Sequence, residues 1–172
     1  EALRVSQEQS RLVIETASDA FVGMDATGLI MDWNRQAEII FGWKRSEVIG
    51  RALADTLFPE TEREAHLAGL ERFLETGEWP ILHHRVEISV LHRDGRLFPC
   101  EMTLWPIHVQ DTYIFNAFLR DISERKQNEE ILRARTEELE RLNRLMSGRE
   151  HKMIELKEEI RMLKERFGER VS

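Results

Sequence analysis

The chain contains little cysteine and no long apolar run. Cys100 is its only cysteine, which excludes a disulfide framework and a cysteine-based metal knuckle and favours a reducing compartment, so we expect a cytoplasmic protein. No apolar run approaches the ~18 residues of a membrane span. The first residues, EALRVSQEQSR, lack the apolar core of a signal peptide. The sequence does not begin with methionine, which favours an excised fragment and leaves a full-length protein as the alternative.

Positive charge is also scarce. Lys and Arg total 25 against 32 Asp and Glu, which gives a net charge of -7. Phosphate binding needs a basic surface, so nucleic acid is excluded as the main partner. Residues 121–172 balance their acidic and basic side chains, and the negative excess lies in the first 120 residues. The tail is therefore neutral but densely charged, as a solvated helix is.

Catalytic motifs are absent as well. The sequence has no Ser/His/Asp grouping, no Walker loop and no diguanylate-cyclase motif. His151 stands in REHKMIE, which does not continue like the phosphorylated His-Glu-Leu-Arg-Thr-Pro segment of sensor kinases, and no ATP-binding glycine box follows. We therefore expect no enzyme activity within this chain, although it can be a fragment or partner of a sensor kinase or another effector.

What is present fits one compact domain with an appendage. Residues 6–17 have the apolar spacing of a short amphipathic helix, and AFVGMDATGLIMDWN predicts two strands joined by a turn at Gly28. Asn34 is placed to cap a helix that ends at Gly42, and a short turn follows at residues 46–50. The longest helix of the domain is expected after Pro59, ending at Gly77, with Ala65, Leu67, Leu70, Phe73 and Leu74 on its apolar face.

Three longer strands are expected after this helix. Residues 81–92 and 97–109 flank an Asp-Gly turn, which is a strong hairpin signal. Residues 113–120 form a further strand that is apolar on both faces. We expect Phe115, Ala117 and Leu119 to face the interior of the domain, where they would line any inner cavity, and the opposite face to need a cover of its own.

From Ser123 onward there is no proline, and apolar residues recur every seven positions. This pattern is typical of a coiled coil, and because such a helix cannot bury its seam alone, it predicts a homodimer of parallel or antiparallel helices. Arg135 and Arg149 interrupt the seam, and Ser147-Gly148 is a poor pair for a helix interior. The seam consists of Leu132, Leu139, Leu142, Met146, Met153, Leu156, Ile160, Leu163 and Phe167.

Three segments resemble a PAS domain in combination, order and spacing. They are DAFVGMDATGLIMDWNRQAEIIFGWKRSEVIGR, RVEISVLHRDGRLFPCEMTL and FNAFLRDISERK. The resemblance implies an α+β fold: a five-stranded antiparallel sheet with helices on one face, enclosing a cavity for a ligand or cofactor, and then a long C-terminal coiled coil. The expected boundaries are 1–18 for the N-terminal helix, 19–122 for the PAS core and 123–172 for the signalling helix.

LRDISERK, residues 119–126, is similar to the family's DIT-type exit motif, with Ser123 in the threonine position. The resemblance gives Asp121 and Ser123 an anchoring role between the last strand, which ends at Arg120, and the outgoing helix. Either side chain can accept hydrogen bonds from the first helical turn, worth roughly 1 kcal/mol. We expect a signal to pass from the sheet through this joint into the coiled coil.

His66 is the candidate cofactor ligand. Heme-binding, oxygen-sensing PAS proteins place an axial histidine in this helix, and arginines nearby that Arg72 and Arg85 resemble. A neutral imidazole is a sound iron ligand, and Leu70, Leu91 and Leu104 are candidates for the apolar lining. The alternative is that His66 is a half-buried helix residue in a PAS domain without a cofactor.

Two other site chemistries are weaker. Cys100 is not in the helix where light-oxygen-voltage domains carry their flavin-reactive cysteine; Trp33, Asn34 and Asn116 remain possible contacts to a redox flavin. His83 and His84 are adjacent on an expected strand, so their side chains diverge and a metal site there is disfavoured.

The cofactor therefore stays open among none, heme b and flavin. The sequence favours a bacterial-type two-component sensory module that passes a ligand- or partner-dependent change to a downstream effector. The alternatives are a heme-based oxygen or redox sensor through His66, and a ligand-free module for dimerisation and protein interaction.

Overall fold

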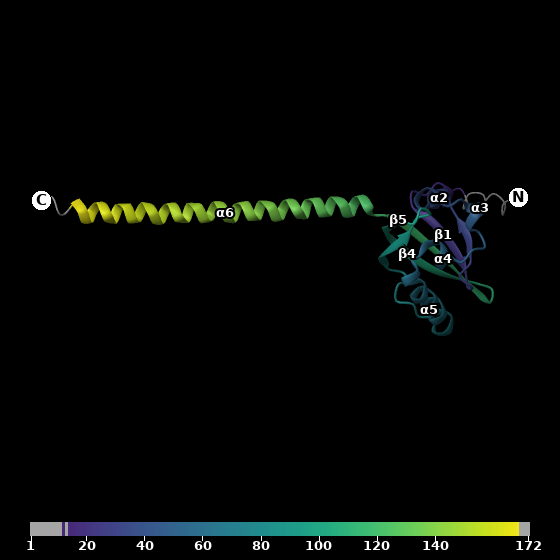
Figure 1. Cartoon of the computed structure of the whole chain (residues 1–172). Coiled ribbons are helices and arrows are strands. Elements are labelled where there is room, and N and C mark those ends of the chain that lie inside the picture. The colour runs from purple at the N-terminus through teal and green to yellow at the C-terminus, as the bar shows by residue number, and fades with distance from the viewer. Residues whose placement is uncertain (1–11, 13, 169–172) are drawn as a thin grey trace. The chain divides into compact units, whose positions relative to one another are not determined.

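The computed structural model describes residue 12 and residues 14–168, with side chains described up to residue 166. The chain divides into two compact units, Glu1–Glu124 and Arg125–Ser172. The first unit holds a five-stranded sheet and its helices, and the second consists of most of one long helix (Figure 1).

The five strands form one antiparallel sheet in the order β2-β1-β5-β4-β3. Strand β5 lies at its centre, between β1 and β4. Inward-facing residues alternate with outward-facing ones, as the period of two in a strand requires. The strands are β1 (Ala20–Asp25), β2 (Ile30–Trp33), β3 (Arg85–Leu91), β4 (Leu97–Val109) and β5 (Thr112–Asp121).

Four helices connect β2 to β3: α2 (Arg35–Phe41), α3 (Arg45–Val48), α4 (Leu53–Leu57) and α5 (Glu60–Thr76). The predicted cap at Asn34 is confirmed, since its Oδ1 accepts a hydrogen bond from the Ala37 backbone N–H at 2.9 Å. Gly42 ends α2 with a φ of 79°, the left-handed conformation that favours glycine. The α+β fold with a five-stranded antiparallel sheet agrees with the expectation from the sequence.

The side chain of Asn34 also connects the start of β1 to the segment before it. Its Oδ1 accepts from the Phe21 backbone N–H, and its Nδ2 donates to the carbonyls of Ile14 and Asp19. Leu12, Ile14 and Glu15 are helical. The rest of the predicted N-terminal helix, apart from residues 16 and 17, lies outside the described residues.

Two details of the predicted elements were wrong. The strand expected to begin at Ile81 begins at Arg85, because residues 81–84 form a turn in which His83 has a φ of 61°. The apolar face of α5 is narrower than expected. Leu67 and Leu74 are about half exposed, whereas Leu70 and Phe73 are buried.

The last helix, α6 (Ser123–Gly168), runs 46 residues without a break, or about 70 Å at 1.5 Å per residue. None of the helices in the described part of the chain is both long enough and apolar enough to cross a membrane.

Candidate ligand cavity and exit joint

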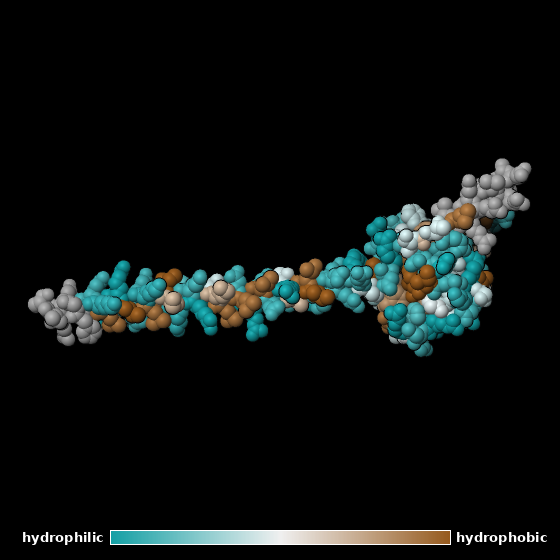
Figure 2. All heavy atoms as spheres, turned by 90° about the horizontal axis from the view of Figure 1, so that it is seen from above, coloured by the Kyte–Doolittle hydropathy of each residue, from teal (hydrophilic) through white to brown (hydrophobic). Residues whose placement is uncertain are grey.

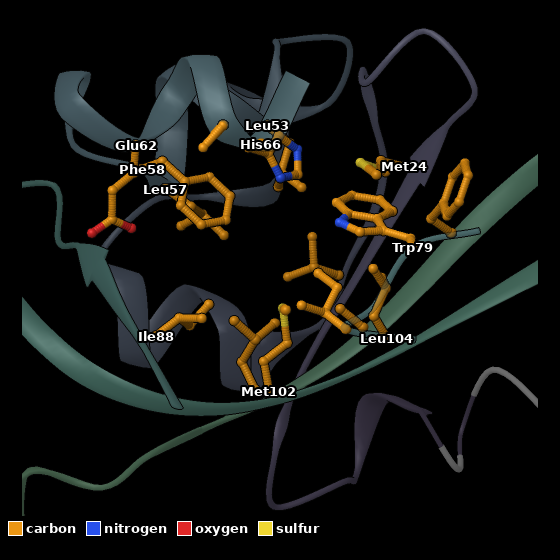
Figure 3. Close-up of a pocket in the computed structure, with 16 residues that line it drawn as sticks. Met24, Leu53, Leu57, Phe58, Glu62, His66, Trp79, Ile88, Met102 and Leu104 are labelled. Atoms are coloured by element: carbon orange, nitrogen blue, oxygen red, sulfur yellow. The ribbon is translucent and has the colours of Figure 1, made fainter. Parts of the chain in front are cut away.

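A cavity of about 310 Å³ lies between the inner face of the sheet and the helices α4 and α5 (Figure 3). This volume is at the lower end of the range for small-molecule sites, roughly 300–1,000 Å³. Its wall is almost entirely apolar. The lining residues from the sheet are Val22, Met24, Ile88, Met102, Leu104, Phe115, Ala117 and Leu119; the others are Leu53, Leu57, Phe58, Glu62, Ala65, His66, Trp79 and Ile81.

His66 is the one histidine among the described residues that line the cavity. Its ring stacks on Phe58 at a centroid distance of 4.6 Å and lies 5.7 Å from the ring of Trp79. Nε2 is buried and makes no hydrogen bond to any described residue. Burial lowers the pKa of His66, so the ring is neutral at physiological pH and retains a lone pair on one nitrogen.

The two arginines expected beside His66 lie elsewhere. Arg72 is 61% exposed and pairs with Glu78, and Arg85 is 76% exposed and pairs with Glu101. Neither lines the cavity, and of the three leucines expected to line a heme pocket only Leu104 does so. The cavity wall therefore holds an unpartnered imidazole nitrogen, but no arginine or lysine is among its described lining residues.

The other sequence candidates do not form a site. Trp33 and Asn34 are buried away from the cavity lining, and Asn116 alternates with the lining residues of β5. His83 contacts the ring of Trp105 at a centroid distance of 4.8 Å. Among the described residues there is no cluster of three or more His, Cys, Asp or Glu that suits a metal ion.

The thiol of Cys100 is also unreactive. The residue is fully buried, and burial, with a smaller contribution from the charge of Asp121, raises the pKa of its thiol to about 12. The thiolate is the reactive form of cysteine. Cys100 is therefore a residue of the core, as its position in the inner face of β4 requires.

Strand β5 connects the cavity to the exit joint. Phe115, Ala117 and Leu119 line the cavity, as the sequence predicted, and all three belong to β5. Just after them Ile122 is 3% exposed, and its backbone N–H donates to the Pro99 carbonyl. The Asp121 Oδ1 accepts from the Ser123 backbone N–H at 2.8 Å, so this carboxylate satisfies a donor at the first residue of α6.

The side chain of Arg120, near the end of β5, connects this strand to Asp19, which directly precedes β1. Its Nε and Nη2 donate to the two carboxylate oxygens of Asp19 at 2.8 and 3.0 Å, in the bidentate geometry of arginine–carboxylate pairs. The Asp19 carbonyl accepts from Asn34 Nδ2. A continuous set of hydrogen bonds therefore runs from Ile14 through Asn34 and Asp19 to the last residues of β5.

The predicted seam residues of α6 are exposed along the second unit, where Figure 2 shows apolar side chains among hydrophilic ones. Leu132, Leu139, Leu142, Met146, Met153, Leu156, Ile160 and Leu163 are between 45% and 67% exposed. The side chain of Phe167 lies outside the described residues. Ion pairs four residues apart, such as Arg161 with Glu165, occupy other positions of the helix.

Two residues of the cavity wall, Phe58 and Trp79, were not predicted from the sequence. Phe58 follows the short helix α4, which was not expected, and Trp79 lies in the connection between α5 and β3. The signal available was local: Gly69 in the middle of α5. A methyl group there would lie 2.5 Å from Nε1 of Trp79, so the glycine creates the space for the indole ring.

The comparisons with known proteins agree with this geometry. A family model described as PAS fold matches residues 8–122. An uncharacterized protein of Azorhizobium caulinodans is 39% identical over 121 residues, covering 70% of this chain and 16% of that protein. Sensor protein FixL of Bradyrhizobium diazoefficiens is 29% identical and covers 84% of this chain and 28% of the relative.

The cell-division control histidine kinase PdhS of Brucella ovis is 31% identical over 143 residues, covering 82% of this chain. The chain spans only 13% to 28% of the length of these relatives. Among solved structures, a PAS domain from Colwellia psychrerythraea superposes with a TM-score of 0.58 at 24% identity, covering 69% of this chain and 98% of that one. A PAS domain of an HTR-like protein from Haloarcula marismortui gives 0.51 at 25%, covering 70% and 97%.

Proposed function

The chain belongs to the PAS fold family, and from this premise we propose that it is the sensory and signal-transducing module of a cytoplasmic, two-component type sensor. A change in the contents of the cavity shifts β5, and the shift passes through Arg120, Asp121 and Ser123 into α6. The module acts as a homodimer, and the effector lies outside these residues. The likeness to sensor protein FixL and to the histidine kinase PdhS supports a kinase as that effector.

One observation carries the proposal: the strand that lines the cavity is the strand that leads into α6. Leu119 is in the cavity wall, and only three residues separate it from Ser123. A ligand that enters the cavity contacts Phe115, Ala117 and Leu119. Because packed protein interiors transmit strain, a change in these contacts is passed along the strand. The hydrogen bond from Ser123 to Asp121 fixes the root of the helix to the same strand.

Dimerisation through α6 follows from its exposed seam. A coiled coil covers such a stripe by knobs-into-holes packing with a second helix. We take the two helices to be parallel, because each then leads from its sensory unit toward a common effector. Arg135 and Arg149 would face their copies across the seam. This like-charge contact weakens the coiled coil. Two arrangements of the paired helices can then have similar free energies.

Heme binding is the second candidate function, and the unpartnered Nε2 of His66 favours it. The positions of Arg72 and Arg85 count against it, since heme propionates would enter a wall without a cation. A ligand-free interaction module is the third. It is favoured by exposed apolar residues on the outer face of the sheet, including Trp105, Ile107 and Phe118.

Cysteine crosslinking tests the signalling proposal without a ligand. Leu139→Cys places a thiol in the seam, and Cys100 stays unreactive because it is buried and its thiol pKa is raised to about 12. Ala117→Leu fills part of the cavity from β5. We expect it to change the rate of disulfide formation at position 139 by at least about fivefold, a typical allosteric coupling, and we expect Asp121→Ala to abolish that difference.

Glu137→Cys, which faces away from the seam, is the control and should crosslink slowly in every background. Sedimentation should show a dimer at micromolar concentration. A monomer, or equal crosslinking rates at position 139 with and without Ala117→Leu, would contradict the proposal.

A further inference from the structure

The polarity of the cavity wall limits what can bind in it. Only Glu62, His66 and Trp79 among the lining residues carry a nitrogen or oxygen in the side chain. Glu62 is exposed at the surface of α5. Figure 3 shows His66 and Trp79 bordering the open space, with leucine, isoleucine and methionine side chains opposite. A ligand in this cavity therefore exchanges water for an almost wholly apolar surface.

A charged ligand does not fit such a wall. The arginines near α5 are paired elsewhere: Arg63 bonds the carbonyl of Phe58 and pairs with Asp55, Arg72 pairs with Glu78 and Arg85 with Glu101. An anion would lose its hydration without gaining a countercharge, and Glu62 would repel it. For a cation the exposed carboxylate of Glu62 offers only a weak, solvated partner. The absence of a buried countercharge therefore favours a neutral ligand over an ion.

Aromatic rings make up one side of the cavity. Phe58 stacks on His66, and Trp79 lies between His66 and Phe115 at centroid distances of 5.7 and 6.1 Å. Offset-stacked and edge-to-face contacts favour a flat ring placed against such a group. A planar aromatic ligand gains these contacts in addition to the burial of its apolar surface.

His66 supplies the single polar contact. Its Nε2 is buried and unpartnered among the described residues, and a buried polar atom left without a partner costs free energy that a bound group can recover. The ring is neutral, so Nε2 accepts a hydrogen bond when Nδ1 carries the proton. For this tautomer, the matching ligand group is a hydroxyl or a ring N–H.

We propose that the cavity binds a small, neutral aromatic molecule that carries one hydroxyl or ring N–H group, which donates a hydrogen bond to Nε2 of His66. This inference rests on the proposed function, because it names the class of ligand for the cavity of that sensor. The aromatic ring of the ligand contacts Phe58, Trp79 and Phe115. The ligand also contacts Ala117 and Leu119 of β5, and these contacts transmit its presence to that strand.

Indole and benzofuran test the proposal as a pair. They have nearly the same shape, but indole has a ring N–H where benzofuran has an oxygen that cannot donate. Titrated into the full chain by calorimetry, indole should bind about tenfold more tightly than benzofuran, the ratio that one hydrogen bond to a buried acceptor typically gives. Indole-3-acetate, an anionic relative, should bind more weakly than indole.

Variants at position 66 identify the partner. His66→Leu should remove the difference between indole and benzofuran, whereas His66→Gln, which keeps an acceptor, should preserve part of it. Leu67→Ala, on the exposed side of the same helical turn, is the matched control for folding and should leave the ratio unchanged. Circular dichroism of each variant confirms the fold.

Equal affinities of indole and benzofuran for the unsubstituted chain, or a failure of both to bind, would overturn the proposal. So would tight binding of hemin with a Soret band that His66→Leu abolishes. These binding results do not decide the signalling proposal. That proposal is tested by the crosslinking comparison at position 139, which uses Ala117→Leu and needs no ligand.

Discussion

His66 is the residue whose surroundings decide the chemistry of the cavity. It faces apolar walls contributed by the sheet and α4, and the nearest lining carboxylate, Glu62, is on its own helix and exposed. Burial therefore lowers its pKa without a compensating charge. The ring is kept neutral, which makes it a hydrogen-bonding group and not a charge sensor at neutral pH.

This shift has a defined effect on stability. The folded protein resists protonation of His66, whereas the unfolded chain takes up a proton near pH 6.5. The free energy of unfolding should therefore be highest above that pH and fall below it, by up to about 1.4 kcal/mol for each unit that burial lowers the pKa of His66. Urea unfolding at about pH 5 and about pH 8 measures this difference.

His66→Gln removes the titrating group and serves as the comparison. The unsubstituted chain should lose more stability than the variant between the two pH values, because the other titratable groups contribute equally to both. Parallel losses would show that His66 titrates normally and is not buried as described.

Single residues were predictable where one local rule decided them. Asn34 was identified as a cap from its position before an amphipathic helix, and it makes that bond. The inward direction of Phe115, Ala117 and Leu119 followed from alternation along a strand. The outward positions of Arg72 and Arg85, where they pair with Glu78 and Glu101, were not predicted, because the resemblance to heme-binding PAS proteins placed both beside His66.

At the scale of elements, α5 and the connection after it form one side of the cavity. Gly69 lies in the interior of α5, where glycine usually lowers helix stability, and its missing side chain leaves space for the indole of Trp79. Trp79 in turn contacts His66 and Phe115. The packing of Trp79 against Gly69 therefore holds the connection between α5 and β3 to the helix.

The same substitution at two glycines separates helix propensity from packing. Gly148→Ala, in α6 with no atom within 4 Å of the new methyl group, should stabilise that helix by about 0.5–1 kcal/mol. Gly69→Ala should instead destabilise the first unit, because the methyl group would lie 2.5 Å from Nε1 of Trp79. Thermal unfolding followed by tryptophan fluorescence reports the first unit, and circular dichroism reports α6. If Gly69→Ala stabilised the first unit, Trp79 would not occupy the space beside Gly69.

The elements themselves were predictable to different degrees. The five strands and α2, α5 and α6 have strong periodicity or clear caps and turns, and all were expected. Helix α4 is only five residues long, too short for a period to show. The start of β3 was placed four residues early because Ile81 and Leu82 have strand-forming side chains, but they pack at the turn beside the cavity.

At the scale of the whole molecule, the two units differ in where their apolar residues lie. The first buries a hydrophobic core around the cavity, and the second exposes a regular apolar stripe between charged positions. In the proposed homodimer, a second copy covers this stripe in a coiled coil. The heptads predicted the helix from sequence alone, whereas the exit joint needed the geometry of Asp121, Ile122 and Arg120 to be understood.

The coupling between the cavity and the helices is the central claim, and the distance between the two α6 helices tests it most directly. Spin labels on Glu137→Cys, outside the seam, give that distance by double electron–electron resonance. We expect two populations of distances whose ratio changes at least about fivefold when Ala117→Leu fills the cavity, and no change with the outward-facing control Phe118→Leu. Identical distance distributions with and without Ala117→Leu would contradict the claim that β5 transmits the state of the cavity to α6.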